Sequence, residues 1–143
     1  MASRDLHNRI ALKAGIEPAA ANTGNTPWVS EIVDTQGYES VEFVILNGSL
    51  ADADATFAVL FEDGDAANMS DHAEVDAKYL LGTEALASFT YAADNKVFKI
   101  GYRGIKRYCR VTITPSANST DAYVAGVWVL GNPHSAPTAN PPA

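Results

Sequence analysis

Five stretches of the chain alternate between apolar and polar residues with a period of two, the pattern of half-buried β-strands. They are rich in β-branched and aromatic residues, which favour strands. The stretches cover residues 40–47, 55–62, 96–102, 106–114 and 122–130. Turn signals separate them at Asn47-Gly48, Asp63-Gly64-Asp65, Arg103-Gly104 and residues 115–118. This spacing predicts an all-β, antiparallel sandwich or barrel and not a series of βαβ units.

The ends of the chain and one internal segment are less regular. In residues 1–16, Ser3 can cap a helix, but the alternation from Ile10 to Ile16 favours a strand. For residues 66–80 we expect a helical turn or an irregular edge of a sheet. Residues 131–143 contain four prolines and almost no large apolar side chain, so we expect an extended arm that a neighbouring chain orders. The predicted parts are 1–28 as N-terminal arm or strand and loop, 29–131 as β-sandwich domain, and 132–143 as Pro-rich arm.

Size and composition indicate one folded domain without a membrane segment or a disulfide framework. The 143 residues are 47% hydrophobic and 19% charged, which is the ordinary globular range. The N-terminus lacks the apolar core of a signal peptide, and no stretch approaches the ~20 apolar residues of a membrane helix, so we expect no membrane partner. A single cysteine excludes an internal disulfide framework.

Candidate catalytic and metal-binding residues have structural explanations. His7, His72 and His134 are scattered without metal-ligand spacing, and Cys109 lies in phase with apolar strand positions, as a core residue does. The sequence has no nucleophile elbow, phosphate loop or dinucleotide fingerprint. We therefore expect no catalytic residue, no cofactor and no metal. Trp128 is predicted in the core, whereas Trp28 in a polar loop either caps the sandwich or contacts a partner.

Charge is segregated along the chain, whose formal net charge is −7. Thirteen acidic residues and no Lys or Arg lie between Lys13 and Lys78, whereas residues 95–120 carry six basic residues and no acid. The two halves are therefore expected to attract each other, either within one chain or between copies.

A tight hairpin at Arg103-Gly104 would place the basic residues of 99–114 on one surface. It sets Ile100 opposite Arg107 and Phe98 opposite Cys109. The other face then carries Val97, Lys99, Gly101, Lys106, Tyr108 and Arg110. A solvated outer face is one interpretation, because outward positions of an antiparallel sheet are normally polar. The absence of any acid favours the other, a docking surface for an acidic protein face, because solubilising faces intersperse both signs.

Much of the chain resembles a family of small tailed-phage proteins, the head decoration or cement proteins. The resemblance rests on residues 33–62, 80–83, 95–114 and 127–137, within about residues 6–137. It implies a β-sandwich of jelly-roll type without cofactor. It also implies assembly as a dimer or trimer and binding to the outside of an icosahedral capsid.

The sequence thus predicts a non-enzymatic structural protein that decorates and stabilises a phage capsid by binding the major capsid protein. Its expected location is the outer surface of the virion, and the host bacterial cytoplasm during assembly. The expected interface residues are Lys99, Lys106, Tyr108, Arg110, Trp28, Pro133, His134 and Pro137. One alternative is a carbohydrate- or receptor-binding sandwich module of a phage particle. A nucleic-acid binder is disfavoured by the acidic charge, so no nucleic-acid partner is expected.

Overall fold

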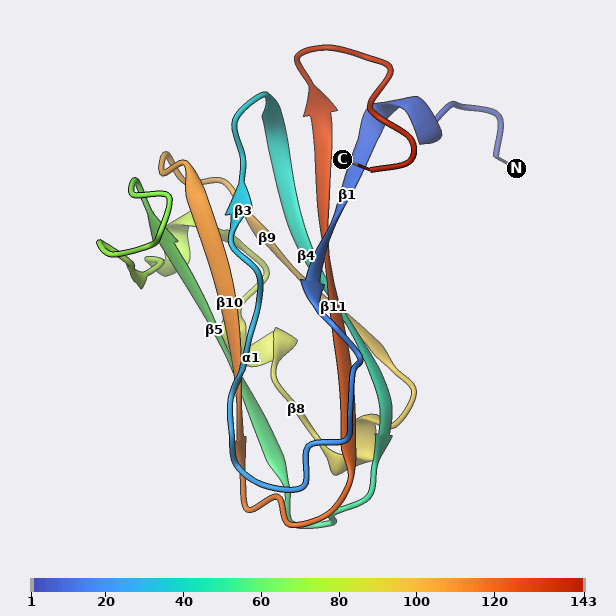
Figure 1. Cartoon of the computed structure of the whole chain (residues 1–143), viewed down its shortest axis with the longest axis vertical. Helices are drawn as coiled ribbons and strands as arrows, with labels where there is room; N and C mark the ends of the chain where they lie inside the picture. The colour runs from blue at the N-terminus through green and yellow to red at the C-terminus, as the bar shows by residue number, and fades with distance from the viewer. Residues whose placement is uncertain (1, 143) are drawn as a thin grey trace.

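Two antiparallel sheets face each other in the computed structural model, which describes residues 2–142 (Figure 1). Sheet 1 has the strand order β1-β11-β4-β9-β7. Sheet 2 has the order β2-β10-β5-β6, with β3 also paired to β10 and β8 to β5. The strands are β1 (Ile10–Ile16), β2 (Trp28–Val29), β3 (Val33–Asp34), β4 (Tyr38–Leu50), β5 (Thr56–Gly64), β6 (Ala73–Glu74), β7 (Leu80–Leu81), β8 (Phe89–Thr90), β9 (Val97–Tyr102), β10 (Tyr108–Ser116) and β11 (Ala122–Pro133). The short helices are η1 (His7–Arg9), η2 (Ala77–Tyr79), α1 (Glu84–Ala87) and η3 (Tyr91–Ala93).

The order of the strands makes this sandwich a jelly roll. The chain passes back and forth between the sheets, so that β1, β4, β9 and β11 lie in sheet 1 while β2, β5, β8 and β10 lie in sheet 2. The late strand β11 inserts between β1 and β4, and β10 inserts between β2 and β5. These two insertions produce the double Greek key of a jelly roll, so the predicted fold class is confirmed.

Aromatic side chains from both sheets fill the core. Trp128 on β11 and Phe43 on β4 have ring centroids 4.6 Å apart, and Phe61 on β5 lies 5.7 Å from the Trp128 ring. The remaining face of Phe61 stacks on Tyr102, at 5.6 Å. Cys109 is also fully buried. Trp128 and Cys109 are therefore core residues, as the alternation predicts.

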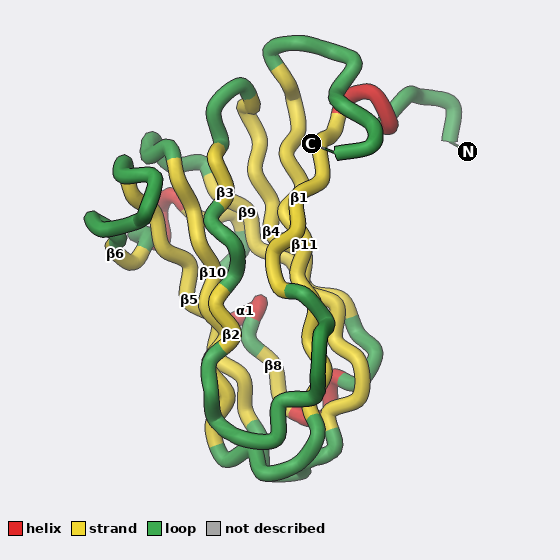
Figure 2. The backbone as a smooth tube through the Cα atoms, in the orientation of Figure 1, coloured by secondary structure: helices red, strands yellow, loops and turns green. Residues whose placement is uncertain are grey.

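Side chains of the α1 segment close the free edge of β5. This strand pairs with β8 at Thr56–Phe57 and with β6 at Glu62–Asp63. Between these short partners, the Val59 N–H donates to Ser88 Oγ at 3.0 Å and the Phe61 N–H donates to Glu84 Oε1 at 2.6 Å. The α1 segment thus satisfies backbone donors that would otherwise lack partners at a sheet edge. Figure 2 shows the α1 turn beside β8.

Several element boundaries differ from the predicted ones. Asn47-Gly48, predicted as a turn, lies inside β4, since the thirteen-residue strand continues past it to Leu50. Between Asn47 and Leu50, β4 carries one residue more than the paired segment Ala122–Val124 of β11, so a β-bulge stands where the turn was predicted. Residues 10–16 form β1, at the edge of sheet 1, and β11 continues to Pro133. The sandwich therefore includes residues on both sides of the predicted 29–131 domain.

Candidate protein-binding surfaces

The predicted hairpin at Arg103-Gly104 does not form, because β9 and β10 belong to different sheets. Within β9, Lys99 pairs with Val44 of β4, in sheet 1. Within β10, Tyr108 pairs with Asp34 and Gly64, in sheet 2. The residues between the strands cross from one sheet to the other instead of reversing within one. The structure thus keeps Lys106, Tyr108 and Arg110 together but places Lys99 on the other sheet, which corrects the predicted common surface.

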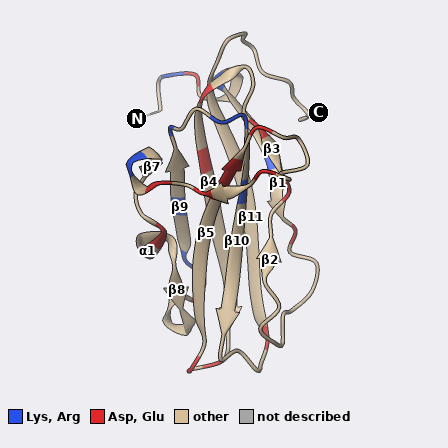
Figure 3. Ribbon diagram, turned by 90° about the vertical axis from the view of Figure 1, so that its left-hand side faces the viewer, with Lys and Arg blue, Asp and Glu red and all other residues tan. Residues whose placement is uncertain are grey.

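Acidic residues of the same chain pair with the basic residues near β10. Lys106 Nζ contacts Asp65, and Arg110 donates from Nη2 and Nε to Glu62 Oε2, at 2.7 and 3.0 Å. Arg107 binds both Asp34 oxygens, at 2.7 and 2.9 Å. Figure 3 shows basic and acidic segments together in the upper part of the view, whereas the lower halves of β5 and β10 carry neither. The attraction between the two halves of the sequence is therefore satisfied within the molecule.

These contacts change the interpretation of residues 95–120, which contain no acidic residue. Glu62 on β5 and Arg110 on β10 are cross-strand neighbours, so a neighbouring strand supplies an acid that neutralises a positive charge of residues 95–120. The Arg107 side chain holds the pKa of Asp34 below its usual range through its hydrogen bonds. The absence of acids within residues 95–120 therefore does not indicate a free cationic docking surface, because acidic residues from elsewhere in the chain form ion pairs with its basic residues.

The connection from β9 to β10, residues 103–107, is fixed by hydrogen bonds. We call it the crossing loop. The Tyr102 hydroxyl donates to Asp63 Oδ2 at 2.7 Å and accepts from the Lys106 N–H at 3.0 Å. Burial raises the pKa of this hydroxyl, so it stays protonated and keeps its donor role. At the loop ends, the Arg103 N–H donates to Tyr79 O, and Arg107 O accepts two hydrogen bonds from Thr35.

The middle of the crossing loop presents one apolar side chain to solvent. A Cβ atom on Gly104 would lie 2.2 Å from the Tyr102 hydroxyl oxygen, so this position accepts only glycine while the loop keeps its shape. The next residue, Ile105, is 87% exposed, more than the other large apolar residues of the described chain. The hairpin expected from the sequence would instead pair Ile105 with Tyr102 on the apolar side of the sheet. The fixed loop holds it outward.

Trp28 caps the sandwich. It lies in the two-residue strand β2 and pairs with Ile113 of β10. Its half-buried ring is 6.0 Å from the ring of Phe57. The core-capping interpretation of Trp28 thus accounts for its position, and the ring remains only partly accessible to a partner.

The C-terminal segment folds back onto the start of the same chain. Pro133 ends β11, the His134 N–H donates to Gly37 O at 2.9 Å, and the His134 ring contacts Glu39. Beyond Pro137, the Thr138 N–H donates to Asn8 O at 3.1 Å, and its hydroxyl donates to Ile10 O. The segment after β11 consequently lies beside η1 and the start of β1, in the upper part of Figure 1. The prediction that a neighbouring chain orders the tail is corrected, because residues of the same chain hold it.

The outward side of sheet 1 is apolar, a feature that was not predicted from the sequence. Its more exposed members are between 39% and 61% accessible and come from all five strands; they are Leu12, Val127, Tyr123, Leu46, Val97 and Leu81. Cross-strand pairing places apolar residues side by side in adjacent rows: Leu12 with Val129, Ala14 with Val127 and Val44, and Ala125 with Leu46 and Val97. Leu81 lies at the edge, next to Gly101. We call this surface the apolar face. Its signal in the sequence is that residues 43–46 and 127–130 are apolar on successive positions, which indicates strands covered on both sides.

Two charged residues point outward among these described rows. Glu42 on β4 and Lys99 on β9 lie diagonally, because Glu42 pairs with Gly101 and Lys99 with Val44. The Glu42 carboxylate lies over Gly101, where a Cβ would be 2.6 Å from Oε2. Partial burial raises the pKa of Glu42, and the positive charge of Lys99 opposes this shift. At the edge of the face, Glu39 and Arg103 line a hollow together with Glu42 and Leu81. The apolar face and this edge therefore carry equal numbers of acidic and basic residues.

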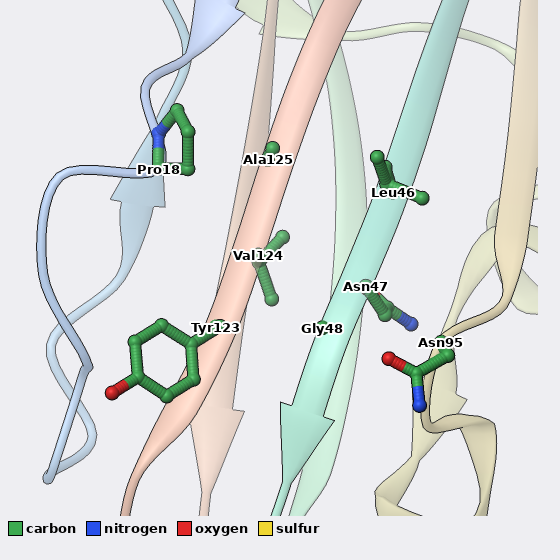
Figure 4. A pocket seen from close by; sticks show the side chains of 8 residues that line it. All are labelled: Pro18, Leu46, Asn47, Gly48, Asn95, Tyr123, Val124 and Ala125. Carbon is green, nitrogen blue, oxygen red and sulfur yellow. The ribbon is translucent and has the colours of Figure 1, made fainter.

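A hollow of about 300 Å³ opens at one end of the apolar face (Figure 4). Tyr123 on β11 and Leu46 on β4 flank it, and Pro18 closes one side. Asn95 contributes a polar group. The hollow is thus an apolar recess with one aromatic ring.

Residues 2–142 offer neither a metal site nor a membrane-spanning helix. No group of three or more His, Cys, Asp or Glu side chains in this range is arranged to hold a metal ion. No described helix is long and apolar enough to cross a membrane.

Comparisons with known proteins give only distant structural likenesses. No protein-family model matches the sequence, and no curated protein matches it. Among solved structures, the VP2 subviral particle of infectious bursal disease virus has a TM-score of 0.48 and 9% identity over 88% of this chain. This chain spans only 33% of that VP2 chain.

Carbohydrate-binding modules show a similar level of likeness. The CBM36-1 domain of a multidomain xylanase from the hindgut metagenome of Trinervitermes trinervoides has a TM-score of 0.44 and 13% identity, covering 86% of this chain and 96% of that domain. The xylan-binding module CBM15 has a TM-score of 0.44 and 12% identity, covering 92% and 96%. At these scores the likeness carries no argument about function.

Proposed function

We propose that this chain is a non-catalytic structural protein that decorates the outer surface of a phage capsid by binding the major capsid protein. The observation that carries the proposal is the crossing loop, a hydrogen-bonded loop that holds Ile105 in solvent. The sequence resemblance to head decoration proteins supplies the identity of the partner. The protein would act on the virion exterior and require no cofactor.

The crossing loop has the anatomy of a protein-docking element. Binding hot spots place an apolar anchor at the centre of a contact and surround it with groups that exclude water. Here Ile105 is the anchor, and Arg103, Lys106 and Arg107 surround it. Because Lys106 and Arg107 already pair with Asp65 and Asp34, the loop loses little conformational freedom on binding. Such preorganisation strengthens association.

Cosedimentation with capsid shells that lack this protein tests the proposal. The wild-type chain is expected to pellet with the shells, and Ile105→Asp to stay in the supernatant, because a carboxylate would be buried in an apolar contact. Leu86→Asp is the matched control, since Leu86 is also strongly exposed but lies on α1. Equal binding of the wild type and Ile105→Asp, or an equal loss with Leu86→Asp, contradicts docking through the loop. Absence of wild-type binding contradicts the capsid function itself.

A carbohydrate-binding module remains the second candidate, and the hollow beside Tyr123 is the observation that favours it. Aromatic rings stack on apolar faces of sugars, and this hollow offers one ring. A glycan array with the wild type and Tyr123→Ala separates the two functions. Saccharide binding that disappears in Tyr123→Ala would favour the module.

A further inference from the structure

We infer that two copies of this chain associate face to face through the apolar face of sheet 1. The outward side of an antiparallel sheet in a soluble monomer is normally polar. Here Leu12, Val127, Leu46 and Val97 belong to an apolar surface that crosses β1, β11, β4 and β9. Leu81 of β7 lies at its edge, beyond Gly101. Contiguous apolar patches of this kind mark sites of association. This inference stands independently of the proposed capsid function.

The size of the apolar face suits a reversible dimer. Four strands, β1, β11, β4 and β9, each about 4.8 Å wide and followed over about six or seven residues of about 3.3 Å, give a flat footprint of roughly 400 Å². The accessible area is larger than this footprint because the side chains project from it. Stable interfaces bury about 800 Å² on each partner, and weaker ones bury less. We therefore expect a dimer that dissociates in the micromolar range.

The charges on the apolar face select a second copy as the partner. Most of the molecule is unsuited to meeting another copy, because the chain has a net charge of −7. The described rows of the apolar face instead carry Glu42 and Lys99, and Glu39 and Arg103 border them. Acidic and basic residues are equal in number there, so two such faces meet without net repulsion. A two-fold axis passing between Glu42 and Lys99 brings Lys99 of each copy opposite Glu42 of the other. Such an isologous contact forms both ion pairs at once.

A dimer built this way also leaves the crossing loops free. The loop is not part of the outward rows of sheet 1, and only its first residue, Arg103, lines a hollow with Leu81 and Glu42 at their edge. Each dimer would therefore present two copies of Ile105 to other proteins. Two linked contacts bind more tightly than one when the geometry allows both to form.

Charge exchange across the proposed two-fold axis provides the test. Analytical ultracentrifugation of the wild type from ~1 to ~300 μM is expected to show a monomer–dimer equilibrium, a range that brackets micromolar affinity. Lys99→Glu and Glu42→Lys should each weaken the dimer by about tenfold or more, because like charges then face each other twice. Mixing equal amounts of the two variants should restore dimers, since in the mixed pair every Glu again faces a Lys.

Control variants keep the test specific to the apolar face. Lys106→Glu and Asp54→Lys make the same changes of charge on residues outside this face and should leave the dimer intact. Leu46→Asp should give monomers with an unchanged circular dichroism spectrum. A wild-type chain that stays monomeric throughout the concentration range overturns the inference. So does a mixture of Lys99→Glu and Glu42→Lys that forms no dimers. Neither result affects the comparison of Ile105→Asp with wild type on capsid shells.

Discussion

Gly104 determines the shape of the crossing loop. The Tyr102 side chain lies across the loop, and its hydroxyl is fixed by Asp63 and by the Lys106 backbone. The space above Gly104 is thereby filled by the Tyr102 ring, whose nearest atoms lie 2.2 to 2.4 Å from the position that a Cβ on Gly104 would take. Any side chain here must displace Tyr102 and break its hydrogen bonds. The exposed position of Ile105 therefore depends on a glycine beside it.

Gly104→Ala is expected to destabilise the protein by about 1–3 kcal/mol, the usual cost of forcing extra atoms into a packed site. Urea denaturation measures this change. Gly24→Ala is the control, because a methyl group on Gly24 meets nothing within 4 Å. If Gly104→Ala and Gly24→Ala have the same small effect, the packing of Tyr102 against the loop is not what fixes it.

At the scale of elements, β10 is held to β5 by charge as well as by backbone pairing. Glu62 on β5 is nearly buried and contacts Arg110 of β10 on one oxygen and His72 Nδ1 on the other, at 2.7 Å. A carboxylate in this position needs its partners, because removing one leaves a buried charge uncompensated. The Arg110–Glu62 pair therefore has a structural role in the sandwich.

Arg110→Glu is expected to lower the free energy of unfolding by about 3 kcal/mol or more, since it places a second carboxylate beside buried Glu62. The exchange variant Arg110→Glu/Glu62→Arg should recover part of that loss. Lys106→Glu should cost far less, because the Lys106–Asp65 pair is exposed. Chemical denaturation of the three variants measures these differences. If Arg110→Glu is as stable as the wild type, Arg110 is a solvated surface residue without a structural role.

For the whole molecule, the jelly-roll path brings the two ends of the chain together. The edge strand β1 begins where the segment after β11 returns, so the tail can pair with it locally. Thr138 occupies this position, with its N–H on Asn8 O and its hydroxyl on Ile10 O. The tail thus covers part of an edge strand, which proteins commonly protect.

Truncation after Pro133 is expected to lower the free energy of unfolding by about 1–2 kcal/mol, the net value of a few hydrogen bonds after the cost of ordering the tail. Thr138→Val should show about half of this loss, because it removes the hydroxyl and keeps the side-chain shape. In limited proteolysis, the tail of the free wild-type protein should resist cleavage. Rapid removal of the tail without any change in stability would contradict its attachment to β1.

The sequence by itself determined where the long strands lie and which of their residues enter the core. The alternation in residues 40–47, 96–102 and 122–130 identifies strands, and Trp128 and Cys109 are buried as it predicts. These features follow from local geometry, because successive side chains on a strand point to opposite sides. Such a pattern depends only on residues that are close together in the sequence, and not on the rest of the chain.

Only the tertiary structure decided which strands are neighbours. A hairpin of residues 96–102 and 106–114 and a crossing between two sheets have the same alternation, so local pattern cannot separate them. The crossing places Lys99 on the apolar face and sets Arg110 beside Glu62, 48 residues earlier in the chain. It also exposes Ile105. The physical reason is that strand pairing depends on how two complete sheets bury their inner sides against each other, which is a property of the whole chain.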